Sequence, residues 1–238
     1  MPIDLNSMRN SRPPLTQTGV DTGFSDYIRS VYTYMTGGLA ITGAVAYYAF
    51  ASGLFLAIAK TPLIFVIIFA PLAMALFLRF RLEKMSLVTA QVTYWAFATA
   101  MGLSLANIFM MYTGQSIARV FFITAGTFGA MSLYGYTTKS DLTRWGSFLF
   151  MGLIGVIIAM VVNVFLKSSA LQFTISVIGV LVFVGLTAYH TQQVKEMYVY
   201  GEASDSQGKK AIMGALRLYL DFINLFMMLL RLFGGRRS

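Results

Sequence analysis

The chain contains no cysteine and only one histidine, His190, among its 238 residues. The absence of cysteine excludes disulfides, thiol nucleophiles, thiolate metal sites and lipid attachment through cysteine. One histidine cannot build a zinc site without other strong ligands, and no nucleophile pair or phosphate-binding loop is found. Only one aspartate lies within an apolar run, whereas an intramembrane aspartyl protease needs two. We therefore predict that the protein is not an enzyme and has no cofactor.

Charged residues are also scarce, at 11% of the chain. A soluble domain carries about 25%. Hydrophobic residues make up 57%, and the mean hydropathy is +0.70, which indicates a polytopic membrane protein embedded in the lipid bilayer. The net charge is +9. Because the basic residues stand at the ends of apolar segments rather than in a stripe interleaved with aromatic residues, we expect no nucleic-acid partner.

The sequence predicts an all-α fold with seven transmembrane helices. Each apolar run is near the roughly 20 residues that cross a bilayer core as a helix, the form that satisfies its own backbone there. Residues 27–238 would form this seven-helix domain, and residues 1–26 a polar, mobile cytoplasmic tail. The runs are Val31–Leu56, Pro62–Leu78, Ser86–Met111, Ile117–Tyr136, Gly146–Leu166, Leu171–Tyr189 and Ala211–Phe233.

Short connections predict that sequential helices pack as antiparallel neighbours in one bundle, which is compatible with a monomer. The longest predicted connection is Val194–Lys210, whose charged residues, glycines and serines favour a solvated loop. Lysine and arginine are more numerous on the side of the N-terminus, which places that terminus in the cytoplasm. Seven crossings then put the basic end at Arg236 and Arg237 outside, so the last run either crosses despite its charge or turns back. We favour a full crossing.

The last apolar run carries Asp221, with Arg217 four residues before it and Asn224 three residues after it. At helical spacing these side chains share one face. A carboxylate in a membrane-length apolar run is costly, so it marks a candidate functional site. Asp221 could form an ion or proton site near the cytoplasmic mouth of a pore, with Arg217 and Asn224 as supporting polar residues. Alternatively, an Asp221–Arg217 salt bridge could simply anchor the bundle.

Two further residues approach the same membrane level as Asp221. His190 ends the sixth apolar run, and Arg79 follows the second run, so both are expected near the cytoplasmic face. His190 could pair with Asp221 or face lipid headgroups and solvent. Arg79 is most simply a determinant of topology.

Two motifs resemble the Bax inhibitor-1 family of transmembrane Bax-inhibitor-motif proteins, in particular its bacterial branch. One runs from Leu218-Tyr-Leu-Asp-Phe-Ile-Asn-Leu-Phe226 to Leu229-Leu-Arg-Leu-Phe-Gly234. The other, Ala188-Tyr-His-Thr-Gln-Gln-Val-Lys195, is similar to the Tyr-Asp-Thr-Gln element of the family. The resemblance implies a bacterial inner-membrane protein whose seventh helix is central and wrapped by the other six.

The same resemblance implies a pH-sensitive calcium leak channel gated by two aspartates that share a proton, with an arginine that locks the closed form. Asp221 matches one aspartate and Arg79 the arginine, while His190 stands where the family has the second aspartate. The predicted gate is therefore Asp221, His190 and Arg79. Asp221 is the one candidate metal ligand, for calcium as the transported ion, although an imidazole is a poor calcium ligand. The alternative is a regulator that binds a membrane AAA protease or another membrane protein, and residues 1–26 would be the segment that contacts this partner.

Overall fold

The computed structural model describes residues 17–237, and this part of the chain is helical with no strand. The predicted all-α class is therefore confirmed. The polar tail predicted at residues 1–26 lies mostly outside the described residues, which begin with a helix at Gln17. The helices are α1 (Gln17–Ala51), α2 (Leu54–Ala59), α3 (Leu63–Arg81), η1 (Leu82–Lys84), α4 (Leu87–Leu105), α5 (Ile108–Met111), α6 (Gly114–Thr137), α7 (Thr143–Leu166), α8 (Ser169–Glu196) and α9 (Ser204–Phe233).

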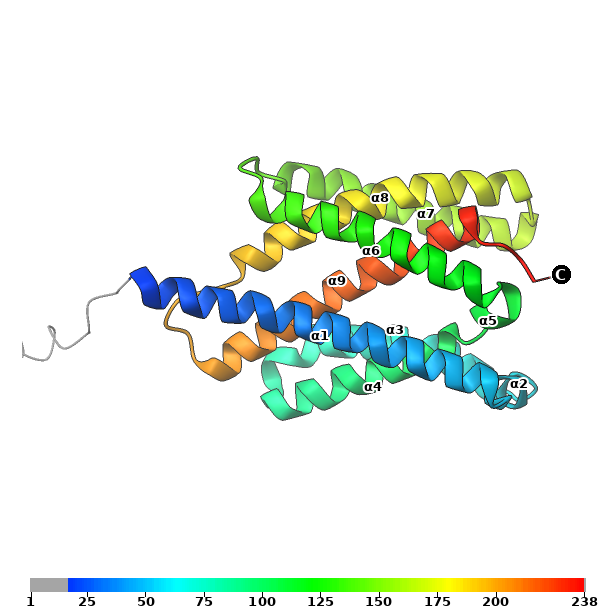
Figure 1. Cartoon of the computed structure of the whole chain (residues 1–238), viewed down its shortest axis with the longest axis horizontal. Helices are drawn as coiled ribbons and strands as arrows, with labels where there is room; N and C mark the ends of the chain where they lie inside the picture. Colours follow the sequence, from blue (N-terminus) through cyan, green and yellow to red (C-terminus); the bar gives the residue numbers. More distant parts are fainter. Residues whose placement is uncertain (1–16, 238) are drawn as a thin grey trace, which may run out of the picture.

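Helix α9 runs through the middle of the bundle, as Figure 1 shows, and packs against α1, α4, α6 and α8. Its residues Leu218, Leu225 and Leu230 are completely buried. Small residues let its neighbours approach closely: a Cβ on Gly214 would lie 3.1 Å from the Val194 side chain of α8. The predicted central position of the last helix is thus confirmed.

The outer helices expose large apolar side chains, as α3 does with Phe65 and α7 with Phe165. An apolar surface of this extent is the surface that lipid covers. By length and composition, six helical segments of the described chain can cross a membrane: 63–84, 87–111, 114–137, 143–166, 169–196 and 204–233. The long helix α1 is not among them, because glycine, threonine and tyrosine lower its mean hydropathy. A count of seven crossings stays a prediction.

In the described part of the chain, three helices begin at a side-chain cap. Ser86, Thr113 and Ser168 each accept a hydrogen bond from the backbone N–H three residues later, at the first turns of α4, α6 and α8. Such caps satisfy backbone donors that the helix itself leaves unpaired. They fix where these helices start and so keep the connections between spans short.

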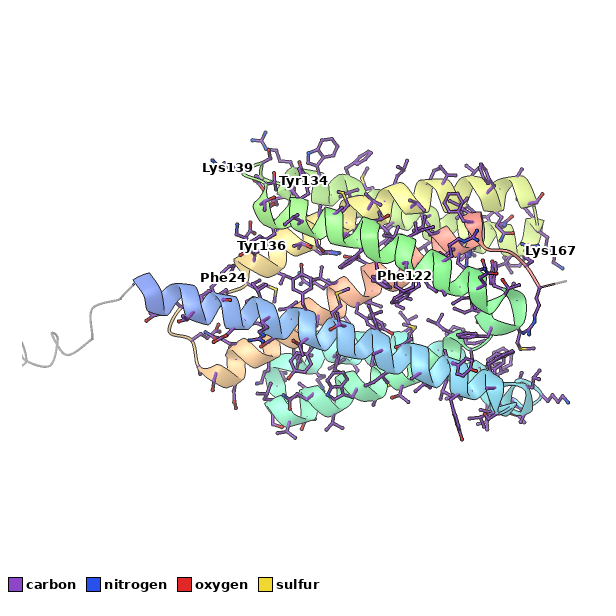
Figure 2. The ribbon with its side chains drawn as sticks, in the orientation of Figure 1. Phe24, Phe122, Tyr134, Tyr136, Lys139 and Lys167 are labelled. Carbon is purple, nitrogen blue, oxygen red and sulfur yellow. The ribbon has the colours of Figure 1, made fainter. Side chains whose placement is uncertain are left out.

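The two ends of the bundle are defined by α1 and α9, which begin at one end and finish at the other (Figure 1). We call these the N-terminal end and the C-terminal end of the bundle. Lys139 lies at the former and Lys167 at the latter (Figure 2). Helix α9 is unbroken, so the last run spans the bundle, as predicted, rather than turning back. At the C-terminal end, Arg237 N–H donates to the Met111 carbonyl and fastens the segment that follows α9.

The predicted loop over Val194–Lys210 is wrong in its extent. Helix α8 continues to Glu196 and α9 starts at Ser204, so only residues 197–203 connect them. The charged residues that suggested a loop are good helix formers, and they continue α8 and α9 beyond the apolar runs.

At the same end of the bundle, Phe24 of α1 stacks on Tyr136 of α6 with ring centroids 6.3 Å apart, and this contact joins α1 to α6 (Figure 2).

Candidate functional site

His190 and Asp221 form a direct pair between α8 and α9. His190 Nδ1 lies 2.6 Å from Asp221 Oδ2. Asp221 is 4% exposed, whereas the His190 side chain keeps 22% of its surface. The structure therefore brings together two of the three residues of the predicted gate.

The pair sits where α8 and α9 are held close along their length. On one side of it, Gly214 of α9 faces Val194, and on the other side Gly179 of α8 faces Met228. A Cβ on Gly179 would come within 2.9 Å of the Met228 sulfur. These small residues let the two helices approach, and the spacing leaves room for one imidazole against one carboxylate.

Three proton arrangements fit the geometry of the pair. Either a protonated or a neutral imidazole donates from Nδ1 to an ionised carboxylate, or a protonated carboxyl group donates to Nδ1 of a neutral imidazole. A carboxylate this buried is costly unless it is paired, and the imidazole of His190 supplies that partner. The pair thus joins α8 to α9 through a buried polar contact.

Arg217 does not form the salt bridge with Asp221 that the sequence left open as an alternative. Its Nη1 donates to Gln193 Oε1 at 2.8 Å, and Gln193 Nε2 in turn donates to the Tyr189 hydroxyl at 2.6 Å. The Tyr189 ring lies next to that of His190, with centroids 5.4 Å apart. Arg217 therefore supports the pair through a second layer of polar groups on α8.

Arg79 and Asn224 stand apart from the pair. Arg79 lines a cavity of about 480 Å³ at the N-terminal end of the bundle, together with Arg217, Glu202 and Lys210. Among residues 17–237, Arg79 makes no ion pair. Asn224 donates from Nδ2 to the Leu220 carbonyl at 2.8 Å, which satisfies it within its own helix.

The described residues offer little for holding a metal ion. Within 17–237 there is no group of three or more histidine, aspartate or glutamate side chains that could hold one. The pair supplies one carboxylate and one imidazole, whereas calcium takes about six to eight oxygen ligands. What the arrangement can do is exchange a proton and change the charge of a buried site.

Two polar residues of this site were not predicted, Gln193 and Tyr189. Both stand in the quoted segment that contains His190, and a glutamine within a membrane-length helix is itself a signal, because amides there seek partners. The neighbouring Gln192 serves a different contact: its Oε1 accepts from Leu142 N–H at 2.8 Å and fixes the α6–α7 connection.

The fold and the pair define a polytopic helical membrane protein with a buried ionisable site on a central helix. A model of the family described as "Inhibitor of apoptosis-promoting Bax1" matches residues 24–238. The chain therefore belongs to the Bax inhibitor-1 family, which confirms the resemblance seen in its motifs. This identity makes it an integral membrane protein, while gating and calcium transport remain proposals.

Relatives of similar length support the assignment. The inner membrane protein YbhL of Escherichia coli K12 is 48% identical over 219 residues, which cover 90% of this chain and 94% of YbhL. The Rickettsia prowazekii protein RP147 is 48% identical, with 92% and 93% covered. A Caulobacter vibrioides relative is 44% identical, with 92% of each chain covered. Location in an inner membrane is supported by the likeness to YbhL.

Proposed function

We propose that the protein is a proton-sensitive cation leak pathway of the inner membrane, with the His190–Asp221 pair as its gate and calcium as the transported ion. The observation that carries the proposal is the 2.6 Å contact of a buried carboxylate with the only histidine of the chain, on a central helix. Intramembrane ionisable residues mark ion or proton pathways by default.

The position of the pair along α9 supports a gate. Arg217 lines the cavity at the N-terminal end, and Met227 lines another cavity of about 360 Å³ at the C-terminal end. These residues are ten positions apart, or about 15 Å along a helix, and Asp221 lies between them. Along α9, the buried side chains of Leu218, Phe222 and Leu225 lie between the two cavities and separate them. The arrangement suits a closed state with its barrier around Asp221.

Protonation would open this barrier by separating the pair. Charged partners attract strongly where the surroundings are poor in water, and loss of either charge removes that attraction. The remaining polar group would then be more stable in contact with water, which favours hydration between α8 and α9.

Arg79 and Arg217 at the cavity mouth would repel cations in the closed state. Calcium would pass without being held, because one carboxylate makes a weak site. On the lysine and arginine count, that mouth faces the cytoplasm.

Flux measurements test the proposal. Full-length protein would be reconstituted into liposomes that contain a calcium indicator. Calcium entry would then be compared between wild type and Asp221→Asn from about pH 5 to about pH 8. We expect Asp221→Asn to lose the pH dependence of calcium entry. Asp26→Asn is the matched control, because Asp26 is an exposed carboxylate on α1, and it should behave as wild type. Equal flux and equal pH dependence in all three proteins would refute the gate.

A further inference from the structure

The cavity at the C-terminal end of the bundle has a polar wall and an apolar floor. It encloses about 360 Å³ between α5, α7, α8 and α9, within the range of about 300–1,000 Å³ that small-molecule sites occupy. The floor includes Ile175 and Leu230, which are buried. Tyr112 also lines the cavity, and its charged and amide side chains are those of Arg231, Asn107, Asn163 and Gln172.

Among residues 17–237, Arg231 has no acidic partner. Its Nη1 contacts the thioether sulfur of Met160 at 3.5 Å, and sulfur is a weak acceptor for a group with five N–H donors. None of the chain segments that meet at this end contains aspartate or glutamate; they are 46–66, 101–119, 160–175 and 222–237. The cations there are Lys60, Arg119, Lys167, Arg231, Arg236 and Arg237. An anion would be attracted to this site.

The amides add donors to the guanidinium. Asn163 accepts from Ser168 N–H through Oδ1 at 3.0 Å, so its orientation is fixed and its NH₂ group remains available. The side-chain amides of Asn107 and Gln172 make no hydrogen bond within residues 17–237. The cavity therefore holds more hydrogen-bond donors than its own acceptors satisfy, together with one unneutralised charge.

We propose that this cavity binds a phosphate-type oxyanion. Arg231 would hold it with two parallel N–H donors, the geometry in which a guanidinium binds phosphate best, and Asn163 would donate from the facing helix α7. Inorganic phosphate and the phosphate group of an anionic lipid share this chemistry. Because α7 and α9 would both contact the anion, occupancy would tie the outer helix to the central one.

Two binding experiments distinguish the sources of the anion. In the first, full-length protein in detergent is titrated with inorganic phosphate against chloride at equal ionic strength, by calorimetry and by thermal unfolding. In the second, native mass spectrometry in phosphate-free buffer measures retention of phosphatidylglycerol. We expect at least one ligand to bind, and Arg231→Gln to weaken that binding about tenfold or more, since it removes charged hydrogen bonds.

Arg119→Gln is the matched control, because Arg119 is an exposed arginine at the same end but outside the cavity. It should change affinity by less than about twofold, the effect of one distant screened charge. Phosphate binding that depends on Arg231 assigns an inorganic anion, and phosphatidylglycerol binding alone assigns a headgroup. If Arg231→Gln fails to fold, Arg231→Lys and Gln172→Leu must each weaken binding. Binding of neither ligand by wild type, or equal losses in Arg231→Gln and Arg119→Gln, would overturn the proposal.

Discussion

His190 Nδ1 lies 2.6 Å from Asp221 Oδ2, and this contact joins the central helix to the neighbour that packs along it. Within residues 17–237 it is one of two ion pairs, and only in this pair does one partner lie almost wholly inside the bundle. A buried pair of this kind is weak support for stability in itself, but breaking it by removing one partner is strongly destabilising. That asymmetry makes the pair suited to a switch.

The first prediction concerns the stability of the pair. His190→Leu leaves the Asp221 carboxylate buried without its partner, and we expect it to lower the free energy of unfolding by about 3–5 kcal/mol. The double variant His190→Leu with Asp221→Asn removes the charge as well, so it should recover most of that loss. Unfolding of full-length protein in detergent, followed by circular dichroism, measures both values. Equal losses in the single and double variants would show that the two residues are not coupled.

The second prediction concerns the pH response of ion flux. We expect His190→Asp to move the midpoint of calcium flux toward acid. Two carboxylates that share one proton would replace the present pair, and such a pair takes up its second proton only at lower pH. His190→Asn keeps a polar side chain that does not titrate there, and should flatten the response. If the pH midpoint of calcium flux is unchanged in both variants, His190 takes no part in gating.

The order of the helices predicted that His190 and Asp221 lie at one level of the bundle, and the resemblance to a family with paired aspartates predicted that they meet. Alternating crossings bring the end of the sixth apolar run and the start of the seventh to one level, and both residues are polar within apolar helices. The partner of Arg217 was beyond such reasoning. Spacing of four residues allows contact with Asp221, yet the long side chain reaches across to Gln193. The packing of α8 on α9 decides between those two rotamers, and spacing along one helix carries no information about it.

The ends of the helices were less predictable than their apolar parts. Hydropathy marks where lipid contact stops, not where the helix stops, and Lys195, Glu196 and Lys209 continue helices beyond that boundary. The resemblance that matched Arg79 to a locking arginine gave its level in the bundle but not its contacts. In the structure Arg79 faces a cavity with other cations, a relation that depends on how α3 meets α9.

The third prediction concerns pH and the α8–α9 connection. Glu202 accepts hydrogen bonds from Lys210 and Ser206, both at 2.6 Å, and these bonds lower the pKa of its carboxyl group. A carboxyl group whose folded pKa lies below its unfolded pKa stabilises the fold fully above the unfolded value, and loses that contribution as the pH falls through the folded value. Order in residues 197–210 should therefore decrease in acid.

Hydrogen exchange of these backbone amides, compared with Glu202→Gln at each pH, measures the effect. The variant should exchange faster than wild type at pH 7, and the difference should vanish in acid, where the wild-type carboxylate is itself protonated. Asp205→Asn is the control, since Asp205 is an exposed carboxylate on the first turn of α9 and makes no ion pair within the described chain. A difference between wild type and Glu202→Gln that persists in acid would assign the effect to packing rather than to charge.

The fourth prediction tests the close approach of α6 and α8. A Cβ on Gly135 would collide with the backbone carbonyl of Ala188, two residues before His190, whereas a Cβ on Gly129 of the same helix would meet nothing within 4 Å. Gly135→Ala should therefore lower the free energy of unfolding by about 1–3 kcal/mol through overpacking. Gly129→Ala should be neutral or stabilising by up to about 1 kcal/mol, because alanine favours the helix. Thermal unfolding of both variants in the same detergent makes the comparison.

Because the collision involves backbone atoms, which cannot rotate away, α8 would have to shift, and with it His190. Gly135→Ala should consequently alter the pH response of flux as well, while Gly129→Ala should leave it unchanged. Equal stability and equal pH response in the two variants would show that α6 does not position the pair.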